Sequence, residues 1–208
     1  MPSSPKAPFG RERSRSASKA KSDWRKGVSR ELAAAKRLFV LGVGNLQRGD
    51  DAAGSLFIRR LEGELARRKS RLAAPAAGPS ASRADLKKSS LVDLQVLDGG
   101  AAPENVTGVI RGFRPTHVLI VDAAAGGHRP GTIFIMDRDK IREDDISTHR
   151  LPLFHLARYL EEDIGCRVIL LGIEPKATGP GRPVSREVGA AASRLASWLG
   201  RVLPVQRA

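Results

Sequence analysis

The chain has 208 residues and a formal net charge of +14, with 36 Lys and Arg against 22 Asp and Glu. This length is enough for one domain with a sizeable core, and a single cysteine, Cys166, excludes an internal disulfide framework. No apolar run reaches the ~18–20 residues of a membrane span, and the first 27 residues lack the apolar stretch of a secretory signal. The composition therefore predicts a cytoplasmic protein without a membrane segment.

The basic charge is concentrated in two segments. Residues 1–37 carry eleven basic and three acidic side chains, and residues 66–90 carry seven and one, so the remaining chain is balanced. Residues 1–22 are rich in Ser, Pro, Lys and Arg and predict a disordered basic tail, which could make weak, salt-sensitive contacts with nucleic acid or acidic surfaces. Residues 66–90 predict a low-complexity insertion. A nucleic-acid-binding protein is one hypothesis, but it requires aromatic and basic side chains together on the folded part.

Helices and strands alternate in a single predicted domain over residues 23–204. The first helix is expected to have Ser29 as its N-cap, and Pro130-Gly131 predicts a tight turn with antiparallel entry into the following strand. Such alternation predicts an α/β fold: a three-layer α/β/α sandwich, phosphorylase/hydrolase-like, with a mixed, mostly parallel five-stranded sheet. In chain order we expect helix 24–37, strand 37–45, helix 52–68, strands 91–100, 116–127 and 131–137, helix 151–165, strand 166–175 and helix 185–203.

The stretch GVGNLQRGDDAAG, residues 42–54, joins the first strand to the second helix. Its G-x-G is a weak sign of a dinucleotide site, because Gln47 stands where G-x-G-x-x-G has its third glycine. Asp50 and Asp51 would also occupy the helix N-terminus, where a pyrophosphate binds. Asp50 alone has a structural interpretation, since an acidic residue at this position caps a helix and complements its dipole.

Acidic side chains are expected together beyond the carboxyl ends of three strands, where parallel α/β sheets bind their ligands. These are the adjacent Asp50 and Asp51, Asp98 and Asp122. Like charges in one crevice repel unless a cation or a shared proton neutralises them. His149, which precedes the helix that begins near Leu151, is a candidate third ligand beside Asp51 and Asp122. Two carboxylates and an imidazole suit nickel or zinc, although a histidine in a loop is more often solvated or a cap.

The other three histidines and the single cysteine are expected to have structural roles instead of catalytic or metal-binding ones. His117 opens a strand, His128 lies in a Gly/Pro-flanked turn and His155 lies on a helix. Cys166 begins a buried strand and is expected to pack there instead of serving as a nucleophile. The sequence contains no Asp-Thr-Gly repeat, H-E-x-x-H or G-x-S-x-G, so conventional protease mechanisms have no support.

The order of these motifs resembles that of the [NiFe]-hydrogenase maturation endopeptidases, over nearly all of residues 36–202. The segments DGGAAPEN, RPTHVLIVDA and YLEEDIG are similar to the subgroup that serves the hydrogenase of formate hydrogenlyase and its energy-converting relatives. Ala52 departs from the glycine that is common after GDD in the family. The matching segments are LFVLGVGNLQRGDDAAG, LQVLDGGAAPEN, RPTHVLIVDA, RPGTIFIMD, ISTHRLPL and ILLGIEP.

The resemblance implies a cytoplasmic, monomeric endopeptidase that removes the C-terminal extension of a [NiFe]-hydrogenase large-subunit precursor after nickel insertion. The nickel-sensing residues of the family correspond to Asp51, Asp122 and His149, and the nickel is supplied by the substrate, with little or none in the resting enzyme. Asp51 and Asp98 are the catalytic candidates of this aspartic-type family. Both general-base catalysis and Lewis-acid catalysis are open, and a non-catalytic factor that binds the large subunit is the alternative.

Overall fold

A five-stranded sheet with the order β2-β1-β3-β5-β4 forms the centre of the fold. The computed structural model describes residues 23–73, 92–137 and 150–203. Four strands run parallel, and β4 is antiparallel to β5, as the Pro130-Gly131 turn predicts. The predicted mixed, mostly parallel sheet is confirmed. Its strands are β1 (Arg37–Gly42), β2 (Asp93–Asp98), β3 (His117–Ala123), β4 (Ile133–Ile135) and β5 (Arg167–Ile173).

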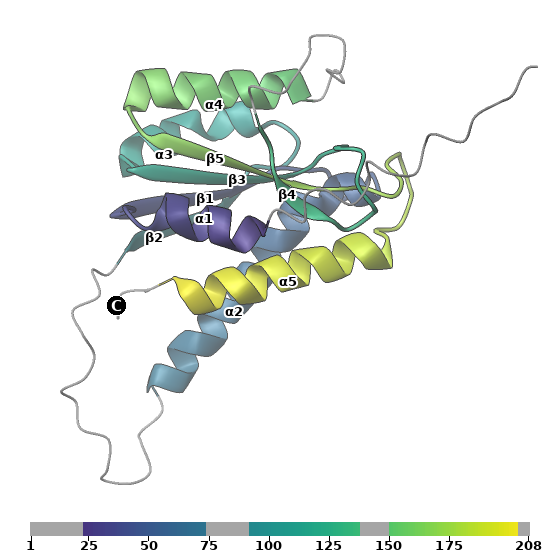
Figure 1. Ribbon diagram of the computed structural model, residues 1–208, viewed down its shortest axis with the longest axis horizontal. Helices are drawn as coiled ribbons and strands as arrows, with labels where there is room; N and C mark the ends of the chain where they lie inside the picture. The colour runs from purple at the N-terminus through teal and green to yellow at the C-terminus, as the bar shows by residue number, and fades with distance from the viewer. Residues whose placement is uncertain (1–22, 74–91, 138–149, 204–208) are drawn as a thin grey trace, which may run out of the picture.

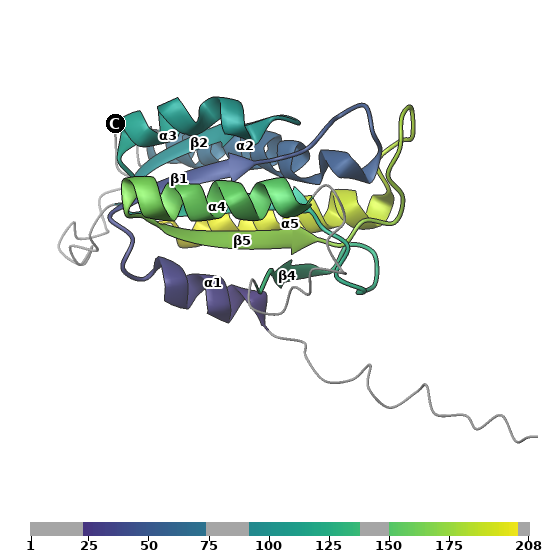
Figure 2. The same cartoon turned by 90° about the horizontal axis from the view of Figure 1, so that it is seen from above.

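Helices cover both faces of this sheet (Figure 1). On one face lie α3 (Thr107–Phe113) and α4 (Arg150–Ile164), and on the other lie α2 (Ala53–Ala73) and α5 (Arg186–Val202). The first helix, α1 (Trp24–Leu32), lies along the sheet edge beside β4 (Figure 2). Two 3-10 turns, η1 (Asp50–Ala52) and η2 (Pro103–Val106), lead into α2 and α3. This arrangement is the predicted three-layer α/β/α sandwich.

Successive residues of the central strands enter two separate hydrophobic clusters, because side chains alternate across a strand. In β1, Leu38 and Val40 pack with α2 and α5, whereas Phe39 and Leu41 pack with α3 and α4. The central strands are thus covered on both faces, which explains why their sequences are continuously apolar and do not alternate.

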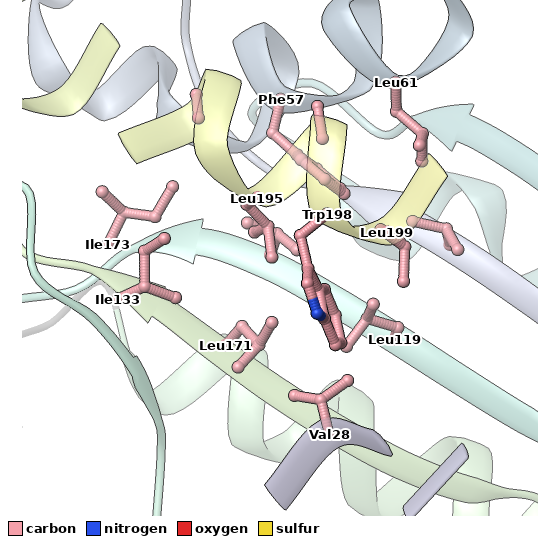
Figure 3. Packing of buried hydrophobic residues seen from close by; sticks show 14 of the residues in the cluster. Val28, Phe57, Leu61, Leu119, Ile133, Leu171, Ile173, Leu195, Trp198 and Leu199 are labelled. Carbon is pink, nitrogen blue, oxygen red and sulfur yellow. The ribbon is translucent and has the colours of Figure 1, made fainter. Parts of the chain in front are cut away.

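The two tryptophans of the chain contact each other in the cluster on the α2 and α5 side. Trp24 of α1 and Trp198 of α5 meet edge to face, with ring centroids 4.9 Å apart. Figure 3 shows Trp198 reaching from α5 toward Val28, between Leu119 and Leu171. An edge-to-face pair adds about 0.5–1.5 kcal/mol to the stabilisation from burial alone. The pair therefore links α1 to α5, which itself packs on the sheet.

The first helix differs from its predicted limits. It begins at Trp24 and ends at Leu32, so Ser29 lies inside it and the predicted cap is wrong. Its N-cap is Asp23, which makes no capping hydrogen bond through its side chain. Burial of Trp24 and Val28, four residues apart on one helix face, sets this start instead.

The second helix extends further than predicted, to Ala73, and so includes the first eight residues of the predicted 66–90 insertion. Arg68 in this part donates to the carbonyls of Gly200 (2.9 Å) and Leu203 (2.6 Å) at the end of α5, where a cation complements the helix dipole. Some of the charge assigned to an insertion therefore belongs to the folded layers. Residues 74–90 and the 1–22 tail lie outside the described residues. None of the helices in the described ranges is long and apolar enough to cross a bilayer.

Candidate functional site

The turn after β1 packs against the start of α2 without intervening side chains. A Cβ added to Gly54 would lie closer than 3.0 Å to the backbone of Val43 and Val121, and one added to Gly42 would lie equally close to the Gly54 carbonyl. A Cβ on Gly44 would meet the Asp51 carbonyl in the same way. The glycines of this turn are therefore required for close backbone packing, which accounts for the G-x-G without a phosphate ligand.

Asp51 lies on η1, directly beyond the carboxyl end of β1. Its carbonyl accepts a hydrogen bond from Asn45 N (3.1 Å), which fixes the backbone of the turn. Its half-buried carboxylate lies 3.8 Å from the guanidinium of Arg48, whose side chain is 41% exposed. Ion pairs at the surface contribute about 0–1 kcal/mol, so this contact holds the Asp51 side chain only weakly.

Asp98 ends β2 and is held by its Oδ1 atom. That oxygen accepts hydrogen bonds from Ser55 Oγ at 2.6 Å and from the Gly100 amide at 3.0 Å. Ser55 is buried on α2, and its hydroxyl also lies 3.2 Å from the Gly44 carbonyl. The hydroxyl has one proton, and the shorter contact to a charged acceptor is the stronger bond. Asp98 is therefore oriented although it is exposed.

Asp122 lies on the other side of β1. In the parallel register, Gly42 pairs with Asp98 on β2 and with Val121 on β3, the residue before Asp122. The half-buried Asp122 carboxylate accepts a hydrogen bond from the Ala123 amide at 2.7 Å.

The three predicted carboxylates belong to segments at the same edge of the sheet, where its parallel strands have their carboxyl ends. Asp98 and Asp122 lie at the carboxyl ends of the strands on either side of β1, and Asp51 lies on the 3-10 turn η1 in the connection that follows β1. The strands β2 and β3 lie on opposite sides of β1, so the direction in which strands are added reverses next to β1. Such a position is a topological switch point, where parallel α/β sheets bind their ligands. Figure 2 shows the carboxyl ends of β1 and β5 pointing in the same direction toward this edge.

The predicted metal trio is only partly within the described residues. His149 lies outside them, so its place beside Asp51 and Asp122 stays a prediction. In the ranges 23–73, 92–137 and 150–203, no three His, Cys, Asp or Glu side chains are grouped so that they could hold a metal ion. The two carboxylates that are described are oxygen donors of a kind that divalent cations accept.

Comparison with known proteins identifies the family. The sequence profile described as HycI, hydrogenase maturation protease, matches residues 82–200, a range that includes Asp98 and Asp122. The chain belongs to the hydrogenase maturation protease family. The hydrogenase 3 maturation protease of Escherichia coli K12 is 39% identical over 166 residues, covering 77% of this chain and 90% of that protein. The resemblance read from the sequence motifs is thereby confirmed, and the chain is a peptidase of this family.

Solved structures of family members have the same fold. The crystal structure of the [NiFe] hydrogenase maturation protease HycI from Thermococcus kodakarensis KOD1 aligns with a TM-score of 0.66 and 29% identity, over 85% of this chain and 98% of that one. The solution structure of the endopeptidase HycI from Escherichia coli aligns with a TM-score of 0.57 and 33% identity, over 77% and 86%. The α/β architecture of this protease is therefore that of its family.

Asp50 does not cap α2, which corrects the structural interpretation of this residue. Its fully buried carboxylate accepts hydrogen bonds from three backbone amides of the β5–α5 connection. Burial by itself would raise the pKa of Asp50, but these bonds outweigh it and hold the pKa below its usual value. The donors are Lys176 N (2.8 Å) and Ala177 N (3.0 Å) to Oδ2, and Ser185 N (2.7 Å) to Oδ1.

Glu174 is a buried acid at the end of β5 to which the sequence assigned no role. Its Oε2 atom accepts hydrogen bonds from Gly126 N (2.6 Å) and His128 N (3.1 Å) in the β3–β4 connection. The signal available in the sequence was an acid directly after an apolar strand, in ILLGIEP. Such a pattern does not reveal that the partners are backbone amides almost 50 residues away.

The other three described histidines occupy different environments. His117 is buried at the amino end of β3, the opposite end of the strand from Asp122. Burial, helped by the charge of Arg167, lowers its pKa. His128 is exposed and contacts Phe134 with the two rings tilted by 56°, and His155 is exposed on α4.

Cys166 is expected to be unreactive toward a thiol reagent in the native protease near neutral pH. Its side chain is 5% exposed and its thiol lies 3.4 Å from the Leu160 carbonyl. Burial raises its pKa to about 11, so the thiolate, which is the reactive form, is scarce below that pH. The reaction with DTNB measures this, and urea-unfolded protein at the same pH is the control that should react fully. A native protein that reacts as fast as the unfolded one would contradict the buried assignment.

Proposed function

We propose that this protease removes the C-terminal extension of a [NiFe]-hydrogenase large-subunit precursor after nickel has been inserted. The observation that supports the proposal is that Asp51, Asp98 and Asp122 belong to segments at the same edge of the sheet, around its switch point, in a chain of this family. The Escherichia coli relative is named hydrogenase 3 maturation protease, which supports the substrate class.

Nickel in this proposal is part of the substrate. Asp51 and Asp122, with His149, contact the nickel of the loaded precursor and thereby distinguish it from the unloaded one. Two features support this role: the ligand types suit nickel, and the Asp51 carboxylate has only a weak ionic contact with Arg48. A site that completes the coordination of a metal held by another protein binds the free ion weakly, so we expect little nickel in the resting enzyme.

Asp98 is the proposed general base, which would make the chemistry aspartic-type. Its Oδ1 atom already accepts hydrogen bonds from Ser55 and Gly100. The Oδ2 atom is therefore the one that would accept a proton from the water that attacks the scissile carbonyl. A general base must be held within hydrogen-bonding reach of this proton, and the two bonds to Oδ1 provide that orientation. Asp51 is the second catalytic candidate, through its contact with the nickel beside the scissile bond.

Location and assembly belong to the same proposal. We place the protease in the cytoplasm as a monomer, and a single cysteine fits a reducing compartment. The basic tail, residues 1–22, is expected to make only weak, salt-sensitive contacts with nucleic acid or acidic surfaces.

The test is a processing assay with the large-subunit precursor, with or without nickel, read as a shift in electrophoretic mobility. We expect cleavage of the loaded precursor alone. Cleavage of both forms would reject nickel as the recognition element while keeping the peptidase role. Stable binding of the precursor without cleavage would instead identify a non-catalytic maturation factor.

A further inference from the structure

Two buried carboxylates outside the Asp51, Asp98 and Asp122 group connect the loops around it. Asp50 and Glu174, here called the clamp carboxylates, are 0% and 6% exposed. Backbone amides donate hydrogen bonds to both carboxylates, and the Ser185 side chain is a further donor to Asp50. Each carboxylate joins segments that are distant in sequence.

Asp50 joins the turn after β1 to the β5–α5 connection, residues 174–185. The two segments also exchange backbone hydrogen bonds, from Asp50 N to the Ala177 carbonyl (3.1 Å) and from Gly179 N to the Arg48 carbonyl (3.1 Å). Gly49 forms an isolated antiparallel bridge with Thr178 at the same place. The Asp50 carboxylate therefore completes a contact that the two backbones have begun, one residue before Asp51.

Glu174 joins the start of the β5–α5 connection to the β3–β4 connection, which follows Asp122. Its carboxylate bonds to the amides of Gly126 and His128, and its own amide donates to the Thr132 carbonyl at 2.9 Å. Gly131 N donates to the Glu174 carbonyl at 2.8 Å. The β3–β4 connection, which begins after Ala123, is thus held by one residue both in its middle and at its end.

Because they are buried, each clamp carboxylate and the backbone amides that donate to it depend on one another. A buried ionised carboxylate without donors is strongly unfavourable, and so are buried backbone amides without acceptors. Loss of either clamp carboxylate would therefore release its loop, while the hydrophobic clusters, which contain neither residue, would keep their packing.

We propose that Asp50 and Glu174 are positioning residues that hold the two connections beside Asp51 and Asp122 in the geometry needed for processing. The catalytic part of this inference rests on the proposed function. A displacement of about 1 Å in a catalytic constellation can lower the rate about 100-fold, so loops fixed by buried hydrogen bonds matter for the reaction even though neither clamp carboxylate touches the substrate.

The two clamps differ in a way that gives a sharp test. Glu174 uses a single oxygen for both bonds, so the carbonyl oxygen of a glutamine can replace it. Asp50 uses both oxygens, so the NH₂ group of an asparagine must face at least one amide donor. Glu174→Gln should therefore behave like the wild type, whereas Asp50→Asn and Glu174→Ala should not.

The experiment measures amide hydrogen exchange and processing kinetics of the full chain at a temperature where every variant is folded. Asp50→Asn should accelerate exchange at Lys176, Ala177 and Ser185 and lower kcat by roughly 10- to 100-fold. Glu174→Ala should accelerate exchange at Gly126 and His128, again with a lower kcat. Glu174→Gln is the matched control and should change neither quantity.

Two results would overturn the inference. Wild-type exchange in Asp50→Asn and Glu174→Ala would show that the carboxylates do not hold the loops. Faster exchange with unchanged kcat would assign them a structural role alone. The exchange measurement needs no substrate, so a wild-type protein that fails to cut any precursor would reject the proposed function separately, while exchange would still decide whether the loops are clamped.

Discussion

Asp51→Asn is expected to abolish processing of the nickel-loaded precursor and to leave the fold intact. Asparagine keeps the shape of the side chain but removes the charge that a cation requires. The side chain is half-buried on the turn η1, and its ionic partner, Arg48, lies 3.8 Å away, so the melting temperature should change little. We expect the rate of processing to fall at least about 100-fold, which is the lower end of the range for removal of a group that acts in the chemical step. The mobility-shift assay measures the rate, and differential scanning calorimetry measures the stability.

The matched control for this variant is Asp93→Asn. Asp93 is an exposed acid at the beginning of β2 and forms a comparable surface ion pair, with Arg37 at 3.4 Å. It lies at the opposite end of the strand from Asp98, so processing should proceed at the wild-type rate. Wild-type processing by Asp51→Asn would remove Asp51 from the site.

Gly54→Ala should destabilise the protease more than the addition of a methyl group at any other position of α2. The new Cβ would lie closer than 3.0 Å to backbone atoms of Val43 and Val121, and these atoms belong to the turn and to a central strand. Because no flexible side chain can move aside, we expect a loss at or above the upper end of the usual range for overpacking, about 3 kcal/mol. The midpoint of urea-induced unfolding reports this change in the free energy of unfolding.

Gly63→Ala on the same helix is the control. Its added Cβ would meet only the guanidinium end of Arg67, at 3.8 Å. Replacement of a glycine inside a helix by alanine stabilises by about 0.5–1 kcal/mol, so the two variants should move the urea midpoint in opposite directions. Equal effects of the two substitutions would mean that β1 and α2 are not packed backbone to backbone.

Much of this architecture could be predicted because strand sequences carry their own signal. The apolar runs in β1, β3 and β5 reflect burial on both faces, and this burial was confirmed. The positions of Asp98 and Asp122 in the fold could be predicted because each lies at the carboxyl end of a strand, and parallel strands bring their carboxyl ends to one edge. The helix limits failed where a distant contact decides them. The start of α1 depends on the contact of Trp24 with Trp198, and the end of α2 on the contact of Arg68 with α5.

The buried carboxylates show where sequence reasoning stops. Asp50 has the residue type and position of a helix cap, but its partners lie 126 to 135 residues further along the chain. Glu174 and Ser55 have no local pattern that distinguishes them from solvated residues. Their roles depend on which loops the topology brings together, and that information is not contained in any short window of sequence.

The contact between Trp24 and Trp198 also bears on how the protein is made. During synthesis, α1 emerges before every strand of the sheet, whereas α5 follows the last of them. The apolar face of α1 therefore stays in water until nearly the whole domain has been translated, when Trp198 arrives to cover Trp24. Since the chain contains two tryptophans and both are in this pair, their fluorescence reports the closing step of folding, and an interrupted chain would leave α1 exposed to chaperones.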